Sequence, residues 1–362
     1  MLSPQISRNI SRIIPFGLIW LIFGIIYSLL EKGLLGDLRY YPSTGNPYDF
    51  TGNLFFHLLY ETVLGLFVGT IEILFLNKLF SKKSLGKKIA YKTAFYVAIM
   101  ITFLLVITIV SNSLILKTSL FDSQVWENVL KFSSTFSFWS VELYIAVIIG
   151  LSLFYTEVSD SIGQEVLNSF FTGKYHTPIV EERIFMFLDM KSSTTIAEKI
   201  GHVKYFELLK EYYKDLSNPI VHYRGEIYQY VGDEIVVSWK LKNGLQNSNC
   251  LKCFLSMKEV INKQSEKYIL KFGLVPSFKA GFHLGKVTTG EIGVVKKNIL
   301  FTGDVLNTTS RIQGLCNSYN VDILISGDLI RKMNFDTEFT TVSLGENELR
   351  GRDEKVELFT IL

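Results

Sequence analysis

Four long apolar runs in the first 155 residues constrain this chain more than any other feature. A helix that crosses a membrane needs about 20 apolar residues. The runs are 13–30, 54–76, 93–116 and 132–155. Charges are few in them: the second run holds Glu61 and Glu72, and the fourth holds Glu142. Because no small-residue cleavage site follows the first run, we read it as a span rather than a signal peptide. The pattern predicts an α-helical transmembrane bundle of four spans.

Composition agrees with a chain that is half membrane protein and half soluble domain. Of the 362 residues, 48% are hydrophobic and 20% are charged, whereas soluble domains are roughly 25% charged. The net charge of +3 argues against a polyanion binder, so no nucleic-acid partner is expected. The three cysteines are too few for a disulfide framework, which fits a reducing compartment.

Basic residues between the runs predict the orientation of the spans. The loop after the second run is the most basic, with Lys78, Lys82, Lys83, Lys87, Lys88 and Lys92. Arg8 and Arg12 precede the first run. Because cytoplasmic loops carry the excess of Lys and Arg, we expect both termini in the cytoplasm. The chain is then a multi-pass protein of the inner (cell) membrane, with lipid around its spans.

Three ionisable residues can share one face of the second span. His57 and Glu61 are four residues apart, and Glu61 and Glu72 are eleven apart. At about 100° per residue, eleven residues leave an offset of only ~20°. Ionisable groups inside a membrane usually face a bundle interior or a cavity. The stripe is either a sensor site or a polar contact between helices, and the sequence leaves both open.

The chain divides into three parts on this evidence. Residues 1–156 form the four-helix transmembrane domain, 157–182 a linker, and 183–362 the cytoplasmic domain. Apolar residues in 157–171 follow helical spacing, which predicts that the fourth span continues into a signalling helix. Gly173 and Pro178 then end it. A plain tether is the alternative.

The second half has the pattern of an α+β domain. Expected strands are 183–188, two strands within 225–239, 277–284, 297–301, 322–325 and 356–361; expected helices end near 217, 269 and 319. Pro219 is expected to end the first of these helices. Helices would pack on a mostly antiparallel sheet.

Two carboxylates in this domain are candidates for metal binding. Asp189 ends an apolar strand, and Asp233 lies in the Gly232-Asp233 turn of a hairpin. On adjacent strands they could hold Mg²⁺ against a substrate's phosphates, since Mg²⁺ prefers one or two carboxylates plus phosphate oxygens. The polar turn from Lys191 to Thr194 leads into a helix, and helix N-termini bind phosphate.

Five segments, in order, resemble the class III nucleotidyl cyclases, the adenylate and guanylate cyclase family. They are Phe187-Leu188-Asp189-Met190 with Thr194, Val231-Gly232-Asp233-Glu234, Gly285-Lys286-Val287 with Gly290, Gly303 to Arg311, and Leu349-Arg350-Gly351. The resemblance covers about residues 182–362. It implies a class III cyclase fold with a ferredoxin-like core.

The resemblance also implies the chemistry. Asp189, Asp233 and the Met190 carbonyl would hold two Mg²⁺ or Mn²⁺ ions per active site. Attack of the ribose 3′-hydroxyl on the α-phosphorus would then expel pyrophosphate. Arg311 would stabilise the transferring phosphoryl group, and Asn307 would orient the ribose.

Further residues would bind the triphosphate. Lys286 and Arg350 would neutralise its charge, and Thr194 would lie beside it. In this family the metals come from one protomer and Asn and Arg from the other, so a homodimer is implied.

The choice of purine is less constrained. The resemblance places base reading at Gln229 and Leu300, with Thr302 on the same strand face as Leu300. The Gln229 amide fits either purine, and Leu300 cannot hydrogen-bond. We favour ATP because bacterial members mostly make cyclic AMP, with GTP as the alternative. Ser192-Ser193 replaces the family's usual Gly-Phe after the first metal aspartate.

Two other functions compete. Val-Gly-Asp-Glu-Ile also resembles the diguanylate cyclase signature, but that family has a second Gly where this chain has Val231. A catalytically silent cyclase-fold module for signalling or dimerisation is the other alternative. The presence of both aspartates and Arg311 counts against it.

Overall fold

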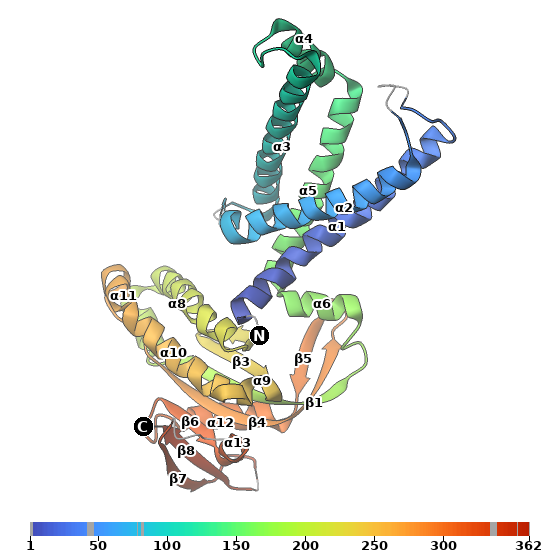
Figure 1. Cartoon of the computed structure of the whole chain (residues 1–362). Helices are drawn as coiled ribbons and strands as arrows, with labels where there is room; N and C mark the ends of the chain where they lie inside the picture. The colour runs from blue at the N-terminus through green and yellow to red at the C-terminus, as the bar shows by residue number, and fades with distance from the viewer. Residues whose placement is uncertain are drawn as a thin grey trace. The chain divides into compact units, whose positions relative to one another are not determined.

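A computed structural model describes residues 3–41, 47–77, 79–80, 83–333, 339–352 and 354–361. The chain divides into two compact units, which we call the helical unit, residues 6–168, and the sheet unit, whose main part is residues 169–362 (Figure 1). The boundaries predicted for the three parts of the chain stay a prediction.

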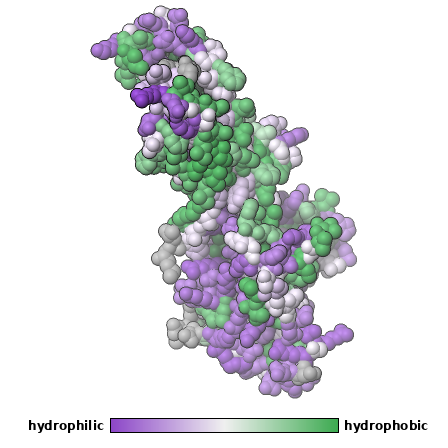
Figure 2. Space-filling model, turned by 90° about the vertical axis from the view of Figure 1, so that its right-hand side faces the viewer, coloured by the Kyte–Doolittle hydropathy of each residue, from purple (hydrophilic) through white to green (hydrophobic). Residues whose placement is uncertain are grey.

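The helical unit consists of long apolar helices. They are α1 (Pro4–Leu35), α2 (Phe50–Ile71) with the π-helical turn η1 (Glu72–Leu76), α3 (Leu85–Leu116), α4 (Ser123–Ser133) and α5 (Phe136–Ile162). In the described part of the chain, four helices are long and apolar enough to cross a membrane: 4–35, 50–76, 85–116 and 136–162. On the face shown in Figure 2, apolar side chains cover the middle of this unit, hydrophilic ones gather at its upper end, and hydrophilic ones predominate on the sheet unit. The four predicted apolar helices are confirmed.

Glycines allow α1 and α2 to approach closely. A Cβ atom added at Gly65 would lie 2.6 Å from Cγ of Trp20, and one at Gly69 would lie 2.8 Å from Cγ of Phe16. Both aromatic residues are fully buried. Gly65 and Gly69 are four residues apart and therefore share one face of α2, which is the spacing of close helix contacts in membranes.

Two details of the helical unit differ from the sequence prediction. The segment before the fourth span forms its own helix, α4, with Val125 and Val129 buried, so the span begins at Phe136 and not at residue 132. The continuous helix predicted through residue 171 is also wrong. Gly163, at φ 98°, separates α5 from α6 (Gln164–Thr172), because this backbone conformation favours glycine and cannot continue a helix.

The interpretation of Lys92 as a loop residue is wrong. Lys92 lies inside α3, its side chain is 1% exposed, and its ammonium group binds the fully buried Glu72. Its Nζ atom is also 3.5 Å from Oε1 of Glu157 on α5. Lys88 contacts Glu157 at 2.6 Å, and the Tyr96 hydroxyl donates to Glu72 at 3.0 Å. We call these five residues the ion cluster. Of the other loop lysines, Lys78 and Lys82 lie outside the described residues.

The predicted stripe on the second span resolves into two separate contacts. Glu61 lies 3.5 Å from Nδ1 of His57 and accepts a hydrogen bond from Tyr144 of α5 at 3.5 Å. Glu72 belongs to the ion cluster. Each carboxylate thus has a partner on another helix, as expected if the stripe is a polar contact between helices.

The sheet unit contains one mixed sheet of eight strands. The strands are β1 (Ile179–Met190), β2 (Glu226–Val231), β3 (Glu234–Lys240), β4 (Phe278–Ile292), β5 (Asn298–Thr302), β6 (Ile323–Ser326), β7 (Thr341–Asn347) and β8 (Val356–Ile361). Their order is β2-β3-β1-β4-β6-β8-β7, and β5 pairs with β4. The β4–β6 pair is parallel, and the other pairs are antiparallel. The predicted α+β class is confirmed.

Helices cover both faces of this sheet. They are α7 (Ser193–Ile200), α8 (His202–His222), α9 (Leu241–Leu245), η2 (Gln246–Ser248), α10 (Asn249–Lys263), α11 (Ser265–Phe272), α12 (Asp304–Gly314) and α13 (Gly327–Lys332). Helices α8 and α10 pack on one face of the sheet (Figure 1). There they bury Ile184, Met186 and Leu188 of β1. The opposite face of β1 buries Phe185 and Phe187 with Val305 of α12. Alternation therefore places Asp189 on the face that α12 covers.

Several boundaries in this unit depart from prediction. Gly201 splits the first predicted helix into α7 and α8, and Pro219 lies inside α8 rather than ending it. Strand β4 continues to Ile292 instead of ending at residue 284, so Lys286 lies within it. Helix α12 ends at Gly314 rather than at 319. Strand β7 and helix α13 were not predicted.

Candidate active site

The two candidate metal carboxylates lie side by side. Leu188 of β1 pairs with Ile235 of β3, so Asp189 comes next to the hairpin turn that carries Asp233. Burial raises the pKa of Asp189 above its usual value, and the hydrogen bond to Asp233 and that residue's charge raise it further. Oδ2 of Asp233 is buried and has no hydrogen-bond partner among the described residues. An oxygen in that state is suited to bind a cation.

A tyrosine of α8 hydrogen-bonds to the turn between β2 and β3. Gly232 adopts φ 62°, in the left-handed region. Its carbonyl accepts a hydrogen bond from the Tyr213 hydroxyl of α8 at 2.6 Å. After the turn, burial and the charges of Asp189 and Asp233 raise the pKa of Glu234 to about 7. The field at this edge of the sheet is therefore strongly negative.

Helix α12 carries the predicted pair Asn307 and Arg311 one turn apart on one face. Asn307 is exposed, while Nη1 of Arg311 is buried and has no hydrogen-bond partner in the described part of the chain. Gly351 lies against this guanidinium, since a Cβ there would be 3.5 Å from Nη2 of Arg311. A buried cationic donor without an acceptor is suited to an anionic ligand.

Three predicted phosphate contacts are all exposed side chains. Lys286 lies on β4, Arg350 precedes Gly351, and Thr194 is in the first turn of α7. Ser192, just before α7, has φ 55°. Met190, the last residue of β1, is buried at 2% exposure, so only its backbone carbonyl is suited to bind a metal.

The strands that carry the predicted base-reading positions, β2 and β5, contact each other through Tyr228 and Phe301. The Phe301 amide donates to the Tyr228 hydroxyl at 3.3 Å, and the two ring centroids are 4.7 Å apart. Gln229 follows Tyr228, while Leu300 and Thr302 flank Phe301. The Thr302 hydroxyl donates to the Thr288 carbonyl at 3.2 Å, which leaves its oxygen as an acceptor.

The structure does not join the two halves of the predicted site within one chain. Among the described residues, no hydrogen bond or ion pair connects Asn307 or Arg311 with either aspartate. Two other residues contact Asp189 instead: Gln313 at 3.2 Å and Lys279 at 3.7 Å. Sequence reasoning missed both, because only the strand register and the place of α12 bring them there.

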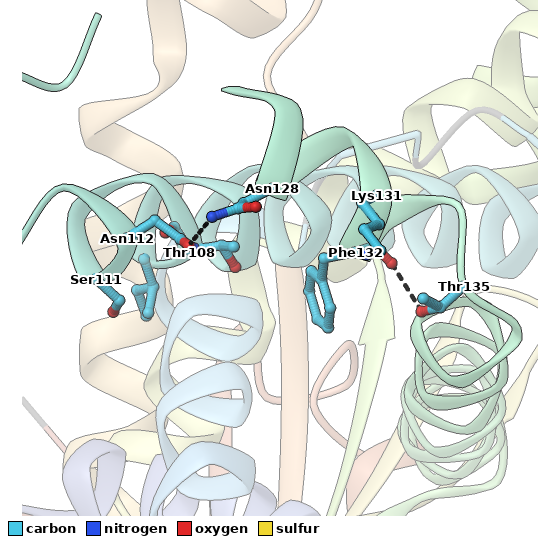
Figure 3. Close-up of a pocket in the computed structure, with 8 residues that line it drawn as sticks. Thr108, Ser111, Asn112, Asn128, Lys131, Phe132 and Thr135 are labelled. Atoms are coloured by element: carbon cyan, nitrogen blue, oxygen red, sulfur yellow. Dashed lines mark hydrogen bonds between the residues drawn. The ribbon is translucent and has the colours of Figure 1, made fainter. Parts of the chain in front are cut away.

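A pocket of about 400 Å³ lies elsewhere, in the helical unit between α3 and α4. Polar side chains line it, among them Thr108, Asn112, Asn128 and Thr135 (Figure 3). Asn128 donates to Asn112 at 3.1 Å. The pocket contains none of the predicted site residues.

Residues 178–362 match the sequence profile of the adenylate and guanylate cyclase catalytic domain. The chain belongs to the adenylate and guanylate cyclase family. The resemblance of the five segments is thereby confirmed, and the sheet unit is a class III cyclase domain. Members of this family generally use divalent metal ions. The match favours this family over the diguanylate cyclases.

Curated relatives include adenylate cyclases. The chain is 33% identical over 222 residues to adenylate cyclase 2 of Rhizobium meliloti, which covers 61% of each protein. It is 25% identical over 183 residues to an adenylate cyclase of Anabaena cylindrica, covering 49% of this chain and 36% of that protein. The chain thus spans less than two thirds of either relative.

A solved structure has the same fold. A bacterial light-regulated adenylyl cyclase aligns with a TM-score of 0.53 at 17% identity, over 64% of this chain and 67% of that one. The likeness concerns the fold alone.

Proposed function

We propose that this protein is a membrane-bound adenylate cyclase, which converts ATP to 3′,5′-cyclic AMP and pyrophosphate. One observation carries the proposal: Asp189 and Asp233 lie together at the sheet edge, and Oδ2 of Asp233 is buried without a hydrogen-bond partner in the described residues. Two neighbouring carboxylates repel each other unless a proton or a cation lies between them.

The ligand set fits Mg²⁺ or Mn²⁺. Asp189, Asp233 and the Met190 carbonyl offer hard oxygen donors, and hard divalent ions use one or two carboxylates with substrate phosphates. In the described part of the chain, no cluster of three or more His, Cys, Asp or Glu side chains offers a closed metal cage. When bound, two such ions lower the pKa of the ribose 3′-hydroxyl and neutralise the triphosphate.

The remaining residues bind and orient the substrate. Arg311 places a guanidinium, with its Nη1 free of other acceptors in the described chain, against the α-phosphoryl group. Asn307 holds the ribose. Lys286, Arg350 and Thr194, all exposed, receive the phosphate oxygens.

The active form is a homodimer. Asn307 and Arg311 contact neither aspartate of their own chain in the described structure, so a second copy would complete each site. Two copies would form two sites, each with the metals of one protomer and the Asn-Arg pair of the other.

Thr302 supports adenine over guanine. Its hydroxyl hydrogen is used by Thr288, so its oxygen can accept from the adenine N6 amino group but has no hydrogen to donate to guanine O6. Leu300 excludes a second polar contact, and the Gln229 amide can serve either purine. Guanylate cyclase activity is the second candidate because of Gln229.

The four apolar helices would lie in the cell membrane among lipids, with both termini and the sheet unit in the cytoplasm. Arg8, Arg12 and the exposed Lys83 and Lys87 support this orientation. Lys92, being buried, does not contribute to it.

The test uses the full chain in membranes, supplied with ATP or GTP and with Mg²⁺ or Mn²⁺, while cyclic nucleotide and pyrophosphate are measured. Asp233→Asn should reduce cyclic AMP formation at least 100-fold (about 3 kcal/mol) without loss of the dimer. Glu259→Gln, a change at an exposed residue of α10, should leave activity unchanged. Wild-type activity in Asp233→Asn would refute the metal assignment. A folded wild-type dimer that makes no cyclic nucleotide would refute the proposal that this protein is a cyclase.

A further inference from the structure

One oxygen of Asp189 is held by two side chains from two different elements. Nε2 of Gln313, on α12, donates to Oδ2 of Asp189 at 3.2 Å. Nζ of Lys279, on β4, lies 3.7 Å from the same oxygen. Gln313 is 7% exposed, and the side chain of Lys279 is 12% exposed. Both donors are therefore largely shielded from solvent, while the side chain of Asp189 is 30% exposed. A hydrogen bond from a shielded donor directs its acceptor more strongly than one in open water.

The backbone fixes both donors. Asp189 and Lys279 are direct partners in the β1–β4 ladder, so their side chains emerge on the same face of the sheet. Gly281 lies two residues further along β4, and a Cβ atom added there would lie 2.4 Å from the backbone nitrogen of Gln313. Helix α12 therefore rests directly on the strand at Gly281, and Gln313 has little freedom to move away from Asp189.

We propose that Gln313, assisted by Lys279, is a positioning residue for the metal site, which orients the carboxylate of Asp189 by holding Oδ2. This inference rests on the proposed function. The other oxygen, Oδ1, would then be available to bind a metal ion together with Asp233. Gln313 is neutral, so it directs the carboxylate without cancelling the charge that attracts the ion. It also belongs to the helix that carries Asn307 and Arg311.

The size of the effect follows from the usual role of such partners. Loss of a residue that hydrogen-bonds a metal ligand typically weakens metal affinity or activity by about 10–100-fold. Gln313→Met keeps the length and most of the volume of the side chain but removes the donor. The helix should therefore stay on Gly281 while Asp189 loses its guide.

The experiment measures Mn²⁺ binding to the full chain by electron paramagnetic resonance, without nucleotide. We expect Gln313→Met to weaken Mn²⁺ binding about tenfold. Lys279→Met should weaken it by a smaller factor, because its contact is longer. In an Asp189→Asn background, Gln313→Met should add almost nothing, since the group that it orients is no longer a ligand. If Gln313 had a purely structural role, Gln313→Met would lower the stability of the chain equally in the wild-type and Asp189→Asn backgrounds.

The matched control is Asn317→Ala, which removes an exposed contact of Lys279 at 3.3 Å and leaves Asp189 untouched. It should bind Mn²⁺ as the wild type does. If Asp189→Asn weakens Mn²⁺ binding and Gln313→Met does not, the inference is overturned while the proposed function stands. If Asp189→Asn also binds Mn²⁺ normally, the metal assignment itself fails, and the inference fails with it.

Discussion

Replacing Lys92 by Met should destabilise the helical unit by about 3–5 kcal/mol, the usual penalty for removing one partner of a buried ion pair. The side chains of Lys92 and Glu72 are each 1% exposed. Met has a similar length, so the change leaves little cavity. Without the ammonium group, Glu72 keeps only the Tyr96 hydroxyl at 3.0 Å. An almost unpaired carboxylate would then remain inside the unit.

Variants of the ion cluster should differ in stability in a predictable order. Glu72→Gln should destabilise less than Lys92→Met, because Lys92 retains Glu157 at 3.5 Å and the new amide oxygen can still accept from Tyr96. The double variant Glu72→Gln/Lys92→Met should be more stable than Lys92→Met alone, since it removes the unpaired charge. Additive losses would contradict this reasoning.

The assay heats the purified full chain in detergent and follows the fraction that stays folded by size-exclusion chromatography. At about 2–4 °C per kcal/mol, Lys92→Met should lower the midpoint by about 10 °C. Lys87→Met, an exposed position on the same helix, should change it by about 2 °C or less. If Lys92→Met is as stable as Lys87→Met, the ion cluster adds no net stability and the argument fails.

Two further predictions concern the sheet unit, and urea unfolding of the full chain followed by pulse proteolysis measures both. Gly281→Ala should destabilise the sheet unit by a few kcal/mol, because its Cβ would lie 2.4 Å from the backbone nitrogen of Gln313. The control is Gly314→Ala, whose Cβ would meet no described atom within 4 Å. Equal unfolding midpoints for the two variants would contradict the close packing of α12. Burial lowers the pKa of His283 from 6.5 to about 4, so the unfolded chain binds the proton more readily and stability should fall by about 2 kcal/mol from pH 7 to pH 5. His283→Gln should lose this part of the pH dependence; an unchanged slope would show that His283 is not its source.

The sequence predicted the four long apolar helices well because such a helix is a local pattern of about 20 apolar residues. It failed where contacts between helices override that pattern. Lys92 was placed in a loop on account of its charge, but Glu72 and Glu157 allow it to be buried inside α3. Helix α4 was missed because only one face of its 11 residues is apolar. A search for long, continuous apolar runs does not detect such a helix.

In the sheet unit, the motifs located the carboxylates but not the residues that hold them. Asp189 stands out because it follows an apolar strand, and Asp233 stands out because it lies in a recognisable hairpin turn. Lys279 and Gln313 meet Asp189 only through the β1–β4 register and the seat of α12 on Gly281. Such non-local contacts leave no periodic signal. The end of β4 was also predicted too early, at residue 284: Gly285 does not end the strand but is a place where α12 approaches it, since a Cβ there would lie 3.1 Å from Val305.

The position of the candidate site follows from the way β1 is packed. Phe185 and Phe187 are buried under α12, and the next residue on that face is Asp189. The apolar core therefore ends where the carboxylates begin, and the same packing that fixes Asp189 also removes part of its water. This desolvation is the first cause of its raised pKa. A cation at this edge would relieve both the desolvation and the repulsion from Asp233. The fold thus holds the two aspartates in an arrangement that is unfavourable for the empty domain and favourable for metal binding.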